Sequence, residues 1–361
     1  MNNNRKFNFA AGPSVLPEPV LTKVQNEMLN YQGIGSSIIE ASHRSKAFMK
    51  IIEDAGKKMR NLLGLSNDYE VLFLHGGASA AFYQIPMNLL NPGDAIDLID
   101  TGMWTKKAIK EAKFFGKVNI AASSSDKNYC YIPKDAELKF TKGVKYRYLC
   151  SNNTIFGTQW KKFPQSPDAP LIGDFSSDIL SRKTDMSSFS MIFAGAQKNL
   201  GPSGVAVIVI KKELLSLCRT DIPSMCSYKI HAENGSMYNT PCTFGIYVIN
   251  YVLDWITDEG GIEAIDKRNT IKAKMLYDTL DSHSMYQPTA DTCDRSSMNV
   301  TFTLPSEETT SEFLKKAEEK GFINLKGHRS VGGIRASIYN AFPVEGIEKF
   351  CKFLKEFAES R

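Results

Sequence analysis

The 361-residue sequence contains no run of eighteen apolar residues, which is about the length that a membrane-spanning helix needs. Its first six residues do not lead into the short apolar segment that a secretion signal contains. These two absences exclude a membrane protein and favour one that works in the cytoplasm, with no membrane partner.

Cysteine is sparse and follows no recognisable spacing. Neither a disulfide framework nor a zinc site is indicated, because the number of cysteines is odd and no C-x-x-C pair occurs. We therefore expect no bound metal and reduced, mostly buried thiols. The seven cysteines are Cys130, Cys150, Cys218, Cys226, Cys242, Cys293 and Cys351.

An excess of charge is also missing. The net charge of +5 is spread along the chain without a basic run, so nucleic acid is not an expected partner, whereas a small anionic substrate is compatible. An apolar fraction of 42% is typical of a globular protein. The chain is longer than a single hydrophobic core usually accommodates, so we expect one large domain and one smaller domain.

What the sequence does contain is an alternation of short apolar strands and helices. Such an alternation predicts an α/β fold with a mostly parallel sheet covered on both faces, and ligands then bind beyond the carboxyl ends of the strands. The expected strands are 71–74, 95–99, 118–121, 146–150, 171–172, 190–193 and 205–210, with helices from 79 to about 90 and over 105–115.

Outside this core we expect further helices and a compact α+β unit near the C-terminus. In the helix expected over 47–63, the helical spacing of apolar residues ends just before Gly64, and glycine commonly terminates helices. The expected helices are 17–30, 47–63, a long stretch after 245, 262–280, 308–320 and 345–358, and the expected strands are 298–304 and 334–338.

Lys198 stands among small residues between two predicted core strands, 191–193 and 205–210. Burial of a lysine amine is costly unless the amine has a partner or a chemical role. Loss of water lowers the pKa of such an amine and frees it to attack carbonyl groups, as Schiff-base lysines do. A solvated loop lysine is the simpler alternative.

Other chemically capable residues also follow predicted strands. The segment 75–79 offers two glycines and a hydroxyl at a helix start, which suits a phosphate, although a tight turn would need the same glycines. Asp174 could protonate a pyridine nitrogen or cap the next segment, and Trp104 could stack on a ring or pack in the core. Thr154 adds another hydroxyl.

Two basic clusters lie far apart in the sequence. His43 and Arg44 belong to an irregular early segment, whereas His328, Arg329 and Arg335 surround a glycine-rich stretch. Arginine side chains bind carboxylates and phosphates as forks, so these residues could receive a substrate with several negative charges. A solvated surface is the alternative for each.

Taken together, the strand ends offer a possible phosphate-binding turn, an aromatic side chain that could stack on a ring, an aspartate and a lysine. This combination is typical of a pyridoxal 5'-phosphate site. At this point the chain resembles the class V aminotransferases of the fold-type I pyridoxal phosphate enzymes. The residues that carry the resemblance are Phe7-Asn8-Phe9, Ser42-His43-Arg44, His75-Gly76-Gly77, Asp174-Phe175-Ser176-Ser177, Ala194-Gly195-Ala196-Gln197-Lys198-Asn199, the run 234–241, Lys326-Gly327-His328-Arg329 and the run 333–340.

The resemblance implies a particular domain organisation and assembly. A seven-stranded, mostly parallel sheet between helices would form a large domain over residues 16–260. Residues 1–15 and 261–361 would form a small α+β domain. The active sites would lie at the interface of a homodimer.

The resemblance also implies a role for each site residue. Lys198 would hold the cofactor as a Schiff base and move a proton between substrate Cα and cofactor C4′. Asp174 would pair with the pyridine nitrogen, Trp104 would stack on the ring, and Thr154 would bond the ring hydroxyl. The cofactor phosphate would be held by Ala78, Ser79, Gln197 and, from the partner subunit, Asn239 and Thr240.

The implied substrates are small anions. Arg335 would hold the α-carboxylate, and His43, Arg44, His328 and Arg329 would hold the distal carboxylate or phosphate. The implied reaction is reversible amino transfer between L-glutamate and 3-phosphohydroxypyruvate, which gives O-phospho-L-serine and 2-oxoglutarate in serine biosynthesis. The 4-phosphohydroxy-L-threonine of vitamin B6 synthesis remains open as a longer substrate.

One departure and two alternatives stay open. Many bacterial members have Gly-Arg where this chain has Ala78-Ser79, so an arginine near the substrate phosphate is missing. A cysteine desulfurase would share the fold but needs a reactive cysteine on a mobile loop. A non-enzymatic protein could use residues 75–79 for a nucleotide phosphate.

Overall fold

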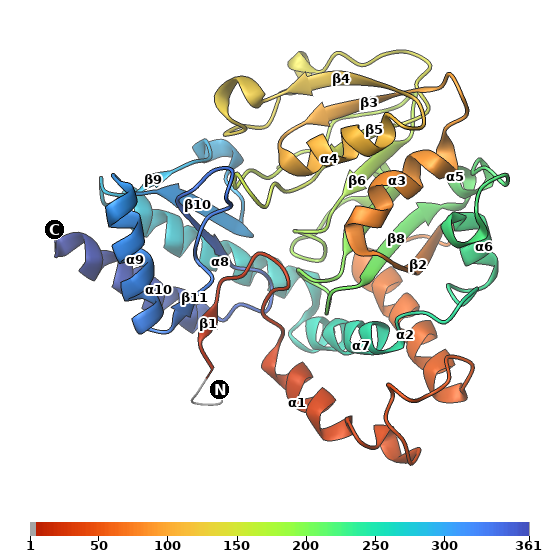
Figure 1. The fold of residues 1–361 in the computed structure, drawn as a ribbon, viewed down its shortest axis with the longest axis horizontal. Coiled ribbons are helices and arrows are strands. Elements are labelled where there is room, and N and C mark those ends of the chain that lie inside the picture. Colours follow the sequence, from red (N-terminus) through yellow and green to blue (C-terminus); the bar gives the residue numbers. More distant parts are fainter. Residues whose placement is uncertain (1–4, 361) are drawn as a thin grey trace.

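The computed structural model describes residues 5–360, and its centre is a seven-stranded sheet of order β2-β8-β7-β6-β5-β3-β4 (Figure 1). Only β8 runs antiparallel to its neighbours, so the other strands all point the same way and the predicted, mostly parallel sheet is confirmed. The strands are β2 (Tyr69–His75), β3 (Ala95–Asp100), β4 (Lys117–Ser123), β5 (Arg147–Cys150), β6 (Leu171–Asp174), β7 (Met191–Gly195) and β8 (Val205–Lys211).

Helices cover both faces of this sheet because its strands are apolar on both sides. Along β8, Val207 and Val209 belong to one buried cluster, whereas Ile208 and Ile210 belong to another on the opposite face. The first face packs against α1 (Glu18–Glu27), α2 (Lys46–Leu63) and α7 (Thr243–Asp258). The second packs against α3 (Gly77–Leu89), α4 (Met103–Ala112), α5 (Lys212–Ser216) and α6 (Tyr228–Glu233).

A smaller α+β part lies beside the large sheet, on the left in Figure 1. Its antiparallel sheet has the order β12-β10-β9, and a separate parallel pair joins β1 near the N-terminus to β11. A third apolar cluster fills this part, with Phe9, Phe313 and Phe350 fully buried. The elements are β1 (Phe7–Asn8), β9 (Gln287–Pro288), β10 (Asn299–Thr303), β11 (Phe322–Ile323), β12 (Ile334–Ser337), α8 (Gly261–Asp281), α9 (Glu307–Glu319) and α10 (Val344–Glu359).

Some expectations need correction. Helix α4 begins at Met103, not at 105, because the Gly102 amide donates to Thr105 Oγ1 at 3.0 Å and caps the first turn. Strands β9 and β11 were not predicted, since two residues cannot show an alternating pattern. The cysteines are free thiols, but only Cys150, Cys218 and Cys351 are buried, so the prediction of mostly buried thiols was wrong.

The loop that carries Lys198 is held from both ends of the chain. The Ser14 amide donates to the Gln197 carbonyl at 2.9 Å, and the Ser14 hydroxyl donates to the Lys198 carbonyl. From the other end, the Asn340 amide donates to Asn199 Oδ1 at 3.0 Å. The fold therefore fixes the backbone on both sides of the lysine.

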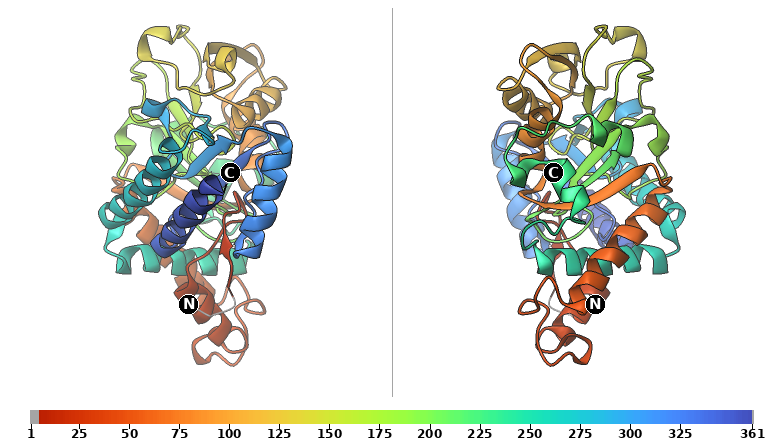
Figure 2. Two further views of the ribbon diagram at one scale, coloured as in Figure 1. Left: turned by 90° about the vertical axis from the view of Figure 1, so that its left-hand side faces the viewer. Right: turned by 90° about the vertical axis from the view of Figure 1, so that its right-hand side faces the viewer.

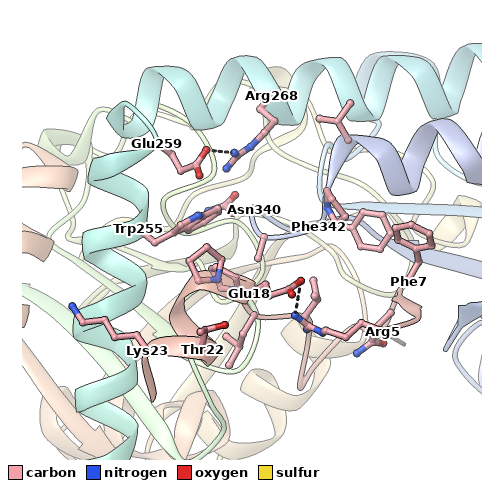
Figure 3. A pocket seen from close by; sticks show the side chains of 18 of the residues that line it. Arg5, Phe7, Glu18, Thr22, Lys23, Trp255, Glu259, Arg268, Asn340 and Phe342 are labelled. Atoms are coloured by element: carbon pink, nitrogen blue, oxygen red, sulfur yellow. Dashed lines mark hydrogen bonds and ion pairs between the residues drawn. The ribbon is translucent and has the colours of Figure 1, made fainter. Parts of the chain in front are cut away.

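A cavity of about 970 Å³ opens at the junction of the two parts (Figure 3). Arg268, over the ring of Trp255 and paired with Glu259 at 2.6 Å, forms one wall, and Phe7 and Phe342 form another. None of the predicted site residues lines it, so this cavity is separate from the Lys198 region. Among residues 5–360, no helix is both long and apolar enough to cross a membrane.

Candidate active site

The common direction of β2, β3, β5, β6 and β7 brings their carboxyl ends to one edge of the sheet, which is where α/β sheets bind ligands. Several of the predicted site residues lie at or just after these ends. Asp174 is the last residue of β6 and Lys198 follows β7, whereas Thr154 follows β5. Ala78 and Trp104 lie in the first turns of the helices after β2 and β3.

Lys198 is buried, with 9% of its surface exposed. Its Nζ donates to Thr154 Oγ1 at 2.7 Å. Burial lowers the pKa of Lys198, and the negative charge of Asp174 acts in the opposite direction. A lowered pKa increases the fraction of free amine, which is the form that attacks a carbonyl carbon.

Asp174 is almost completely buried in the same region, with 3% of its surface exposed. Burial raises the pKa of its carboxyl group, while Lys198 and the Ser176 amide, which donates to Oδ1 at 2.9 Å, lower it. No arginine or lysine forms a direct ion pair with Asp174 among the described residues. The carboxylate therefore remains available for a positively charged ligand atom.

Trp104 presents its ring to the lysine, since Lys198 Nζ lies 5.2 Å from the ring centroid. The indole Nε1 is buried and has no hydrogen-bond partner in the described part of the chain. The ring is held by its position in the first turn of α4, directly after β3. This placement suits a flat ligand stacked between the indole and the sheet edge.

The start of α3 forms a narrow concave surface with β7. A Cβ atom on Gly195 would lie 2.9 Å from Gln197 Oε1 and 3.1 Å from the Ala78 nitrogen, so only glycine leaves this space open. The Gln197 side chain has no hydrogen-bond partner at Oε1. No acidic residue occupies the first turn of α3, and Ser79 is exposed there. Free amides at a helix start suit a phosphate.

A group of cations faces this edge from the smaller part. Arg335 lies on β12, and its Nε is buried without a partner among residues 5–360. Partial burial lowers the pKa of His328, and the positive charges of Arg335, Arg329 and Lys107 lower it further. The side chains of Arg335, Arg329 and Lys107 are therefore close enough to His328 for electrostatic interaction with it. Arg335 also lowers the pKa of Lys198, which links the group to the lysine.

Four predicted site residues are not joined to Lys198 within one chain by any recorded contact. His43 and Arg44 lie between α1 and α2, in a segment that projects from the body of the molecule at the bottom of Figure 2. Asn239 and Thr240 lie before α7, and the Thr240 carbonyl is 2.9 Å from His75 Nε2. The role predicted for Asn239 and Thr240 is that of residues contributed by a partner subunit.

Sequence reasoning missed two contributors that the structure places at this site. Lys107 lies three residues after Trp104 on α4, and its Nζ is 4.5 Å from the ring centroid. The i, i+3 spacing on a helix could have revealed this pair. Ser176 Oγ accepts a hydrogen bond from the Gly195 amide at 3.0 Å, a contact between separate strands that no local pattern signals.

Comparisons with known proteins agree with this geometry. The family profile described as Aminotransferase class-V matches residues 6–350. The phosphoserine aminotransferase of Halalkalibacterium halodurans is 51% identical over 357 residues, which covers 99% of each chain. A solved phosphoserine aminotransferase from Bacillus circulans subsp. alkalophilus is 46% identical, with a TM-score of 0.98 over 99% of this chain and 100% of that one.

A more distant solved relative was described with its cofactor. This pyridoxal-phosphate-bound phosphoserine aminotransferase from Trichomonas vaginalis is 36% identical, with a TM-score of 0.93 over 97% of this chain and 100% of that one. The chain therefore belongs to the class-V aminotransferases and is a pyridoxal-phosphate-dependent transaminase. Within them it belongs to the phosphoserine aminotransferase family, since curated relatives of about half-identical sequence match nearly its full length.

The described residues fit pyridoxal phosphate. The cofactor has an aldehyde, a basic ring nitrogen and a phosphate, and the sheet edge offers a buried amine, a buried carboxylate and a cradle of amides in matching order. The unpartnered Gln197 carboxamide adds a polar group beside that cradle.

Proposed function

We propose that this chain catalyses reversible amino transfer between L-glutamate and 3-phosphohydroxypyruvate, which yields O-phospho-L-serine and 2-oxoglutarate for serine biosynthesis. The observation that carries the proposal is the basic cluster of Arg335, Arg329 and His328, in which the buried Arg335 Nε has no partner among the described residues and the Arg335 charge acts on Lys198. Both amino donors carry a second anionic group beyond the amino acid, which such a cluster would bind.

We propose the following division of work among the residues at the sheet edge. When bound, pyridoxal phosphate supplies an electron sink that stabilises negative charge at the substrate Cα. Lys198 removes and returns the proton at that carbon, because its amine is buried and its pKa is lowered. Asp174 keeps the ring nitrogen protonated, and Thr154 orients Nζ and would bond the ring hydroxyl.

Trp104 and the α3 turn would fix the orientation of the cofactor. The indole would stack on the ring, and its partly buried position restricts its movement. The phosphate would be held by Ala78, Ser79 and Gln197, with Asn239 and Thr240 of the partner subunit closing the cradle. In this arrangement Arg335 binds the α-carboxylate as a fork, while His328 and Arg329 bind the distal anion.

We further propose a homodimer in which His43 and Arg44 of one copy reach the substrate site of the other. The projecting segment exposes large apolar side chains, with Leu29 87%, Ile34 45% and Ile39 56% exposed. Exposed apolar side chains clustered on one projection are a common mark of a protein interface. A second copy would cover them and would complete the cation cluster.

The domain boundaries and the compartment are also proposals. We propose a large domain over residues 16–260 and a small one formed by 1–15 and 261–361. The pairing of β1 with β11 and the separate apolar cluster around Phe313 support this division. Seven free cysteines support a reducing cytoplasm.

The test is a coupled assay with O-phospho-L-serine and 2-oxoglutarate, on the wild type and on Lys198→Ala. We expect an active wild type and a variant that is inactive although folded, because the proton at Cα then has no acceptor. Full activity in the variant would overturn the mechanism. A wild type that binds the cofactor but transfers no amino group would overturn the proposed substrates as an assignment. In that case 4-phosphohydroxy-L-threonine would be tested next.

A further inference from the structure

Lys107 is a cation of the site that the proposed roles leave unused. It lies on α4, and its Nζ is 4.5 Å from the centroid of the Trp104 ring. Lys198 Nζ is 5.2 Å from the same centroid. The two amines therefore lie near one indole ring, which places Lys107 in the region of the proposed site.

No carboxylate neutralises Lys107 in the described part of the chain. Other lysines on exposed helix faces do find partners, as Lys274 does with Asp278 at 2.6 Å. The neighbouring Lys106 interacts with the hydroxyl of Tyr129. Lys107 is instead exposed, lies beside the Trp104 ring and adds its positive charge to those of Arg329 and Arg335 that act on His328.

The positive charge of Lys107 acts on His328, one of the side chains proposed for the distal anion. Lys107 lies on α4, which covers the large sheet, whereas His328 lies in the loop before β12 of the smaller part, so the two residues come from different parts of the molecule. Arg329 and Arg335 act on the same histidine. An anion placed beside His328 would therefore experience positive charge from both parts of the molecule.

The charge of the substrate decides which ligand gains most from this cation. A phosphate monoester carries about −1.5 to −2 charges at pH 7, whereas the side-chain carboxylate of glutamate carries one. With Arg335 committed to the α-carboxylate, Arg329 and Arg44 of the partner subunit together exceed the single charge of a distal carboxylate but only match the charge of a phosphate. A further lysine adds a charge that a phosphate needs more than a carboxylate does.

We propose that Lys107 is a specificity-determining residue that binds the distal phosphate of the substrate and favours phosphorylated over carboxylate substrates. This inference rests on the proposed function. Lysine suits the role because its ammonium is a compact charge on a long flexible stem, which can follow a phosphate through the reaction. The ring of Trp104 supports the stem and limits where the ammonium can go.

The experiment compares Lys107→Gln with Lys110→Gln, an exposed lysine on the same helix that is not among the charges acting on His328. We expect Lys107→Gln to raise KM for O-phospho-L-serine by about tenfold and KM for L-glutamate by at most about twofold, with kcat unchanged. The Ki of inorganic phosphate as a competitive inhibitor should rise in parallel. Lys110→Gln should match the wild type, and Lys107→Arg should restore most of the affinity.

The salt dependence gives an independent readout. Removal of a charge that meets phosphate should make KM for O-phospho-L-serine less sensitive to ionic strength. Equal changes in KM for both substrates, or a change in kcat alone, would mean that Lys107 only supports Trp104 and would overturn the proposal. An inactive wild type would instead overturn the proposed function itself.

Discussion

At the scale of single residues, the chemistry depends on two opposite charges buried in the same region of the sheet edge. Burial shifts the pKa of Lys198 downward and that of Asp174 upward, and each charge opposes the shift of the other. Burial of these two charged groups without a ligand costs free energy, and a bound cofactor would interact with both of them. Function therefore explains why the sheet edge tolerates these side chains.

Asp174→Asn tests the role of the carboxylate. The amide retains the shape but not the negative charge, so a protonated ring nitrogen loses its partner and the electron sink weakens. We expect kcat to fall by about 10²- to 10⁴-fold. The cofactor should still bind, which its visible absorption will report. An unchanged kcat with normal cofactor content would contradict the assigned role.

At the scale of elements, the turn after β12 is fastened by a buried lysine of α8. Lys272 is fully buried, and its ammonium donates to the carbonyls of Ile338, Tyr339 and Phe342 at 2.9, 2.7 and 3.1 Å. These acceptors use all three donors of the ammonium. The same turn carries Asn340, whose amide bonds Asn199 beside the catalytic lysine. The helix thus positions the active-site loop indirectly.

Lys272→Met should destabilise the fold because three buried carbonyls lose their donor. We expect a loss of about 3 kcal/mol or more in the free energy of unfolding, measured by urea denaturation. Lys274→Met is the matched control, since that lysine is exposed on the same helix and pairs only with Asp278. The control should cost about 0.5 kcal/mol or less. Equal effects would refute the buried anchor.

Elements also show where sequence patterns succeed and fail. The seven strands of the large sheet were predictable because each is a short apolar run followed by a turn or helix signal. Strands β9 and β11 depend on partners distant in the sequence, so their two residues carry no signal of their own. Lys107 was overlooked because His328, on which its charge acts, comes from another part of the molecule.

At the scale of the whole molecule, one chain does not complete the proposed site. His43 and Arg44 lie on the projecting segment and make no recorded contact with Lys198. If the dimer forms as proposed, each substrate site combines Lys198 of one copy with Arg44 of the partner subunit. This arrangement predicts how active a dimer of two different variants should be.

Mixing Arg44→Ala with Lys198→Ala should restore activity that neither variant has alone. After exchange of subunits, about half of the molecules combine the two variants, and each of these contains one site with both native residues. We expect about a quarter of the wild-type rate in the coupled assay, with each unmixed variant as its own control. No recovery, despite mixed dimers seen by mass spectrometry, would place Arg44 in the site of its own chain.

The sequence by itself determined the strands, their direction and the residues that follow them, because these depend on local apolar patterns and on a shared sheet edge. It therefore placed Lys198, Asp174, Thr154 and Trp104 together. The cations that approach that edge are set by the tertiary structure, since packing between the two parts brings both Lys107 and Arg335 within range of His328. Long-range packing carries no periodic signal, and so only the folded chain reveals the charges that face the substrate.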